Sequence, residues 1–169
     1  MSEPMLLGLK KKLGPITDIK SVRFVILRAG NNNQYPTIEE VEIRNSANVL
    51  VSRLSGNAGS ASTVYSSGGI NYSANGPFDG VQPGVQVNQW CPTLANVANT
   101  GRTCWWAITF SQQVDLASID MFAQASINRY PVDMDIEVSH NGLTFEKLVE
   151  LRNLSGWAQN VKKSLWKVS

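Results

Sequence analysis

The chain has 169 residues, 43% of them hydrophobic and 17% charged, which indicates one globular domain with a sizeable core. Its 15 basic and 13 acidic residues leave a net charge of +2, too small an excess for the phosphate-neutralising surface of a nucleic-acid-binding protein. No apolar stretch reaches the roughly 18 residues of a membrane span, and residues 5–9 are too short for a signal-peptide core. These features argue against a nucleic-acid partner and a membrane span, and they predict a protein made without an export signal.

The first 19 residues are predicted to form an N-terminal arm or linker. They lack a sustained hydrophobic period, contain two glycines and two prolines, and carry the run Lys10 to Lys12. The domain itself is predicted to span residues 20–169.

Two neighbouring strands are predicted where the domain begins. Residues 22–27 (VRFVIL) are rich in β-branched and aromatic side chains, and a polar break at residues 30–33 separates them from an alternating segment at residues 38–44. Residues 55–85 then hold seven of the 13 glycines without any hydrophobic period, which predicts loops with one short strand. A loop region of this length is a candidate for ligand recognition, although a packed loop without a binding function would have the same composition.

The second half of the chain also favours strands. Residues 103–110 (TCWWAITF) and residues 114–123 are each predicted to be a strand, with a break at residues 111–113. Residues 132–139 alternate strictly between apolar and polar side chains, which predicts apolar groups on one face and the acids Asp133, Asp135 and Glu137 in water.

The last third of the chain contains a turn signal and two further strand patterns. Asn141-Gly142 is typical of a hairpin turn and leads into a strand within residues 143–151, and a final strand is predicted at residues 163–168. Short strands, frequent turn signals and no amphipathic helix favour an antiparallel sandwich or barrel.

The two cysteines, Cys91 and Cys104, leave two interpretations open. Their separation of 13 residues suits a bridge between strands in an oxidising compartment, and equally two buried thiols. Because no export signal is recognised, we predict reduced thiols.

Several short motifs occur in a definite order along residues 20–169. They are RFVIL at 23–27, IEEVEI at 38–43, FDG at 78–80 followed by Trp90, WWAITF at 105–110, VDLASIDM at 114–121 and SHNGLTF at 139–145. Together they resemble the motifs of discoidin-like domains, which have the galactose-binding-like fold. The first pair closes the domain in many carbohydrate-binding relatives and opens it here, which is similar to the permuted arrangement of bacteriophage structural and tail-associated proteins. The resemblance implies an all-β, antiparallel jelly-roll β-sandwich.

The same resemblance implies a cation site. In calcium-bearing relatives the Asp of the FDG motif and a Glu of the second motif hold the ion with backbone carbonyls, and these positions correspond to Asp79 and Glu40. Oxygen ligands of this kind suit Ca²⁺. However, the loop after Gly80 reads VQPG, without the further acidic, Asn or Thr ligands that relatives often have.

Catalytic motifs are not found: the chain has a single histidine, His140, in a predicted turn, and no metalloprotease, nucleophile-elbow or phosphate-loop pattern. The aromatic residues are more informative, because sugars bind against aromatic faces with polar side chains at their hydroxyl groups. We predict core positions for Trp90 and Phe110, and opposite faces for Trp105 and Trp106. The candidate ligand-binding residues, all in predicted loops, are Tyr35, Tyr72, Asn128, Arg129 and Tyr130, with Tyr65 beside them in the glycine-rich region.

Taken together, we expect a non-catalytic carbohydrate-binding module of a virion, a capsid decoration, fibre or tail component that contacts host-surface glycans. It would join other virion proteins through its N-terminal arm and act as a homo-oligomer in an assembly. An alternative is a purely structural virion protein without a sugar ligand, and a third is a secreted lectin-like module of a bacterium.

Overall fold

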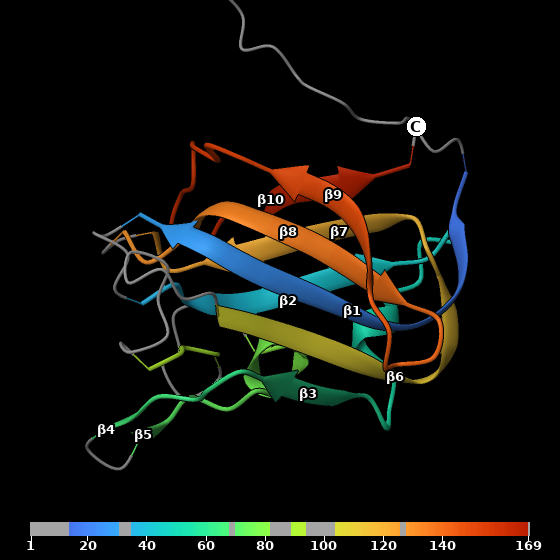
Figure 1. Ribbon diagram of the computed structural model, residues 1–169, viewed down its shortest axis with the longest axis horizontal. Helices are drawn as coiled ribbons and strands as arrows, with labels where there is room; N and C mark the ends of the chain where they lie inside the picture. The colour runs from blue at the N-terminus through green and yellow to red at the C-terminus, as the bar shows by residue number, and fades with distance from the viewer. Residues whose placement is uncertain are drawn as a thin grey trace, which may run out of the picture.

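The protein is an all-β structure with two main antiparallel sheets, consistent with a β-sandwich (Figure 1). The computed structural model describes residues 14–30, 35–67, 70–81, 89–93, 104–125 and 128–168. The strands are β1 (Ile16–Ala29), β2 (Ile38–Arg44), β3 (Ala58–Ala61), β4 (Ser66–Ser67), β5 (Ile70–Asn71), β6 (Cys104–Leu116), β7 (Ser118–Ala123), β8 (Pro131–Ser139), β9 (Glu146–Leu151) and β10 (Lys163–Lys167). Two 3₁₀-helices, η1 (Val51–Arg53) and η2 (Gly76–Phe78), complete the described elements.

The larger sheet has the strand order β3-β6-β1-β8-β9 and the smaller one β10-β7-β2, while β4 and β5 form a separate hairpin. Figure 1 looks onto the larger sheet, with β2 and β7 behind it. Neither main sheet follows chain order, so each is assembled from strands that are distant in sequence. No helix of the described residues is long and apolar enough to cross a membrane.

The hydrophobic core is formed by the alternate side chains that the strands turn inward. Trp90, Trp106, Phe24 and Phe110 are its largest fully buried members. Trp106 is fully buried whereas its neighbour Trp105 is only partly so, which confirms that the two lie on opposite faces of β6. The predicted core positions of Trp90 and Phe110 are confirmed as well.

Several predicted strands are confirmed, and two strand boundaries differ. β2 covers residues 38–44 as expected, and β10 lies within the predicted residues 163–168. The predicted break at residues 111–113 is wrong, because β6 continues through these exposed polar residues to Leu116 and pairs with β1 on both sides of them. β1 begins at Ile16 rather than at residue 22, with Ile16 and Ile19 buried, so the last four residues of the predicted arm belong to this strand. Residues 1–13 lie outside the described part.

The acids of β8 are not simply in water, as the alternation predicted. Asp135 is only 8% exposed and pairs with Lys147 at 2.9 Å and with Arg152 at 2.7 Å. In the same way Asp133 pairs with Arg28 at 2.7 Å and Glu137 with Arg23 at 2.6 Å. The cations come from β1, β9 and the residue after β9, on either side of β8, so the outer face of the larger sheet carries cross-strand ion pairs.

The glycine-rich region contains more regular structure than the single short strand predicted. β3, the β4–β5 hairpin and η2 all lie between residues 58 and 78. The indole Nε1 of Trp106 donates to the carbonyl of Ala74 at 2.7 Å, and the Gly59 amide donates to Asn75 Oδ1 at 2.7 Å. These two bonds attach the region to the larger sheet. Residues 68–69 and 82–85 of this predicted loop region lie outside the described residues.

Both cysteines are free and buried, which confirms the predicted reduced thiols. Burial raises the pKa of the Cys91 thiol to about 11 and that of the Cys104 thiol to about 12. Both side chains are therefore protonated at neutral pH and act as small apolar groups of the core.

Candidate functional site

The predicted ligand-binding residues share one end of the sandwich, the end where β1 stops and β2 and β8 begin (Figure 1, left). We call it the loop end. Tyr35 precedes β2, Tyr72 follows β5, and residues 128–130 lead into β8. Backbone bonds hold these segments together: the Thr37 amide donates to the Arg129 carbonyl at 3.0 Å, and the Gly30 amide donates to the Tyr130 carbonyl at 2.9 Å.

Three tyrosines and an arginine form a continuous cluster at the loop end. The ring of Tyr65 lies 5.5 Å from that of Tyr35 and 5.6 Å from that of Tyr72, both in tilted arrangements. The guanidinium of Arg129 lies 5.0 Å from the ring centroid of Tyr35, within the range of a cation–π contact. Tyr65 is thus the central member of this tyrosine cluster.

Exposure separates the members of the tyrosine cluster. Tyr72 is only 8% exposed and packs against Tyr65, whereas Tyr35 and Tyr65 are half-buried and present part of their surface to solvent. Tyr35 and Tyr65, with Arg129, are therefore the members that a ligand could touch.

Three buried polar atoms at the loop end have no hydrogen-bond partner among the described residues. They are Nε of Arg129, Oε1 of Gln124 and Oε1 of Gln89. The backbone places them together: the Arg129 amide donates to the Gln124 carbonyl at 2.9 Å, and Gln89 precedes Trp90, whose amide bonds to Ile38 of β2. A buried polar group without a partner costs about 1–3 kcal/mol, so these three atoms leave hydrogen-bonding capacity at the loop end that the described residues do not use. The sequence carried no signal for either glutamine.

Tyr130 and Asn128 lie at the loop end but outside the tyrosine cluster. The ring of Tyr130 stacks on Trp157 with centroids 6.0 Å apart and an angle of 24°. Asn128 is exposed and has a positive φ of 57°, and its carbonyl lies so close to Gly30 that a Cβ there would be 2.7 Å away. Both residues shape the turn before β8, so Arg129 is the one member of this tripeptide that reaches the tyrosines.

The two predicted metal ligands are brought together, and an arginine accompanies them. Glu40 on β2 is 1% exposed, and its Oε1 accepts bonds from Nη2 and Nε of Arg53 at 3.2 and 3.4 Å. Burial raises the pKa of Glu40 to about 8; the Arg53 charge lowers the pKa, and the nearby Asp79 carboxylate raises it. Asp79 itself accepts a bond from the Val81 amide at 2.8 Å. Arg53 is at the end of η1, and no sequence pattern indicated that it would meet Glu40.

Among the described residues, the positive charge beside Glu40 is the guanidinium of Arg53. The guanidinium of Arg53 lies within 4 Å of both Glu40 and Glu42 and supplies the positive charge there. A Cβ on Gly80 would lie 3.3 Å from its Cζ, so the Asp79 loop closes over an arginine. No group of three or more metal-ligating side chains of the kinds His, Cys, Asp and Glu occurs among the described residues.

Calcium addition tests this arrangement directly. Because a ligand that binds the folded state raises its stability, a calcium site would raise the thermal unfolding midpoint. We expect no change in the midpoint on adding millimolar CaCl₂, measured against MgCl₂ and a chelator as controls. A rise that calcium alone produces, and that the chelator reverses, would show that Glu40 and Asp79 hold the ion in place of Arg53.

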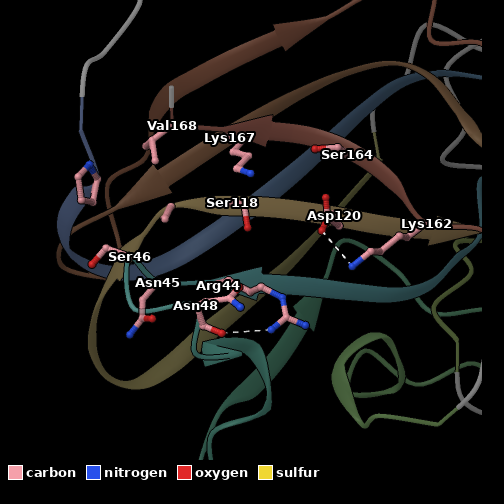
Figure 2. Close-up of a pocket in the computed structure, with 12 residues that line it drawn as sticks. Arg44, Asn45, Ser46, Asn48, Ser118, Asp120, Lys162, Ser164, Lys167 and Val168 are labelled. Carbon is pink, nitrogen blue, oxygen red and sulfur yellow. Dashed lines mark hydrogen bonds and ion pairs between the residues drawn. The ribbon is translucent and has the colours of Figure 1, made fainter.

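The outer face of the smaller sheet is hollowed. A pocket of about 640 Å³, which we call the outer pocket, is lined by polar and charged side chains of all three strands (Figure 2). They include Arg44 of β2, Ser118 and Asp120 of β7, Ser164 and Lys167 of β10, and Lys162 just before β10. A second pocket of about 460 Å³ continues along the same strands past Glu40, Glu42 and Phe122. No residue of the outer pocket was among the predicted site residues.

The fold class is thus an all-β protein of two antiparallel sheets with two polar surface features, the loop end and the outer pocket. No protein-family model matches the chain, and searches among characterised proteins and solved structures gave no match.

Proposed function

We propose that the protein is a non-catalytic carbohydrate-binding module with a galactose-binding-like jelly-roll fold, and that the sugar binds at the loop end. The observation that carries the proposal is the tyrosine cluster, in which half-buried Tyr35 and Tyr65 meet Arg129. A pyranose presents an apolar C–H face and a rim of hydroxyl groups, so it needs an aromatic surface next to polar side chains.

The unpartnered polar atoms at the loop end support the same chemistry. Nε–H of Arg129 can donate a hydrogen bond, and Oε1 of Gln89 and of Gln124 can each accept one. Sugar hydroxyls do both. A ligand that reaches these atoms would satisfy donors and acceptors that the described residues leave without partners.

The expected setting is a virion. The support is the resemblance stated for the sequence, in which the motif pair at residues 23–27 and 38–43 opens the domain as in permuted phage proteins. In this setting the module contacts host-surface glycans, residues 1–13 reach other virion proteins, and several copies act together in one assembly. A secreted lectin-like module is the alternative setting, with the same loop-end chemistry.

A binding experiment with the multimerised protein tests the proposal. We expect saturable binding to one group of glycans on an array and to host polysaccharide, weakened about tenfold or more by Tyr65→Ala, because a stacked ring contributes about 0.5–1.5 kcal/mol beyond its buried area. Tyr65→Phe should keep most of the binding, since it keeps the ring. Phe145→Ala is the matched control, because Phe145 lies beside the β8–β9 turn at the other end of the sandwich.

Two results would contradict the proposal. If Tyr65→Ala binds as tightly as the wild-type protein, the sugar does not bind at the tyrosine cluster. If no glycan or host polysaccharide binds in the assembled state, the protein is better explained as a purely structural virion subunit.

A further inference from the structure

The outer pocket has a regular arrangement that follows from strand register. Ser118 of β7 pairs with Arg44 of β2 on one side and with Lys167 of β10 on the other. Asp120 pairs in the same way with Glu42 and Ser164. Val41, Ile43, Ile119 and Met121 of these strands are buried in the core, so both rows lie on the outer face. We call them the basic row (Arg44, Ser118, Lys167) and the acidic row (Glu42, Asp120, Ser164).

The two rows differ in how their charges are compensated. In the acidic row Glu42 is 3.0 Å from Nζ of Lys162 and 3.4 Å from Nη2 of Arg44, and Asp120 is 3.5 Å from Lys162. The ammonium of Lys167 has no ion pair or hydrogen bond within the described part of the chain. Arg44 donates from Nη1 to the Asn48 carbonyl at 3.2 Å and keeps further N–H groups available. Lys167 therefore carries positive charge that the described residues do not neutralise, while the charge of Arg44 is shared with Glu42.

We propose that the outer pocket binds an acidic saccharide, with the carboxylate or sulfate of the sugar on the basic row. Neighbouring strands are about 4.8 Å apart, so Arg44 and Lys167 flank Ser118 from both sides, and an oxyanion above the serine is within reach of both long side chains. Figure 2 shows the Ser118 and Lys167 side chains on the wall of this pocket, with Arg44 on the neighbouring strand. The serine hydroxyl supplies a neutral hydrogen bond between the two cations.

The acidic row decides which kind of anion fits. Carboxylates accept hydrogen bonds from hydroxyl groups, so Glu42 and Asp120 suit the neutral, hydroxyl-bearing part of a sugar. A nucleic-acid strand carries a phosphate at every nucleotide, so the phosphate next to the one on the basic row would lie beside these acids. The negative charges of the acids and of that phosphate would repel each other. The alternation of basic and acidic rows thus favours a ligand with one isolated charge and many hydroxyls.

This site is independent of the loop end. Arg44 is the last residue of β2, whereas Tyr35 of the tyrosine cluster lies before the first residue of this strand, so the two surfaces are at opposite ends of β2. The proposal adds a second sugar-binding surface, and it does not depend on Tyr65.

Titration of backbone amide resonances at low ionic strength tests the proposal, with methyl glucuronide as the acidic probe and methyl glucoside as the neutral one. We expect saturable shifts in β2, β7 and β10 with the glucuronide alone, weakened about tenfold by Lys167→Gln or Arg44→Gln. Tyr65→Ala should leave this binding unchanged. Lys147→Gln is the matched control, because it removes one surface cation from the larger sheet.

Four outcomes would overturn the proposal. They are equal binding of the neutral glucoside, an equal loss of binding in Lys147→Gln, inorganic sulfate or phosphate binding as tightly as the glucuronide, and a short single-stranded oligonucleotide binding more tightly. The third would mean a simple oxyanion site, and the fourth a nucleic-acid site. Unchanged thermal midpoints of Lys167→Gln and Arg44→Gln show that the loss of binding is not a loss of folding.

Discussion

Replacing Gly59 by alanine is expected to lower the free energy of unfolding by about 3 kcal/mol. A Cβ on Gly59 would lie 2.0 Å from the carbonyl oxygen and 2.5 Å from the carbonyl carbon of Ala74. Both are backbone atoms, so no side-chain rotation relieves the clash. The same oxygen accepts the indole bond of Trp106, and its displacement would leave a buried donor without a partner.

Urea unfolding followed by tryptophan fluorescence measures this effect, with Ser60→Ala as the control. Ser60 is the next residue of β3 and is exposed, so its replacement should change the free energy of unfolding by less than about 0.5 kcal/mol. A Gly59→Ala protein as stable as the control would show that β3 can move away from Ala74 without cost, and that the glycine-rich region is not attached to the sheet as described.

The second large effect is a pH dependence of stability that Glu40→Gln removes. Burial raises the pKa of Glu40 from 4.5 to about 8, so between these pH values the folded state holds a proton that the unfolded state has lost. Stability from this group is therefore fully present below pH 4.5 and decreases as the pH rises to about 8, by at most about 1.4 kcal/mol per pH unit. A glutamine keeps the shape and accepts the Arg53 bond, but it does not titrate.

Urea unfolding from pH 5 to pH 9 distinguishes the two proteins. We expect Glu40→Gln to match the wild-type protein at pH 5 and to be more stable at pH 9. Glu42→Gln is the control with the opposite sign: burial raises the pKa of Glu42, but hydrogen bonds and charges of Lys162 and Arg44 outweigh it and lower the pKa. That variant should lose stability at neutral pH, where the Glu42 carboxylate is ionised and paired. Parallel pH profiles of wild-type protein and Glu40→Gln would mean that Glu40 is ionised throughout.

Local patterns predicted most of the strands correctly for a simple reason. Alternation with a period of two depends only on neighbouring residues, so β8, β2 and β10 were recognised from residues 132–139, 38–44 and 163–168. The polar residues 111–113 were misread as a break because exposed positions of a long strand carry the same residues as a turn. β6 nevertheless continues through this segment, because it pairs with β1 on both sides of it, at Thr109 and at Val114.

The sequence could not predict which of the candidate site residues contact one another. Tyr35 and Arg129 meet at the loop end. Tyr72 is buried against Tyr65, and Tyr130 stacks on Trp157. Exposure of a loop side chain depends on the segments packed around it, and these come from other parts of the chain.

By itself, the sequence determined that the chain is all-β and which alternating segments contribute to the core, but it left open whether the two cysteines are bridged. Only the tertiary structure decided which charges meet, because cross-strand register joins residues that are far apart in the chain. Arg53 pairs with Glu40, and the acids of β8 pair with basic side chains on β1, on β9 and just after β9. Arg44, Ser118 and Lys167 form one row across three strands. Each of these pairings is set by how the strands are ordered in the sheets, a property that no local pattern of residues contains.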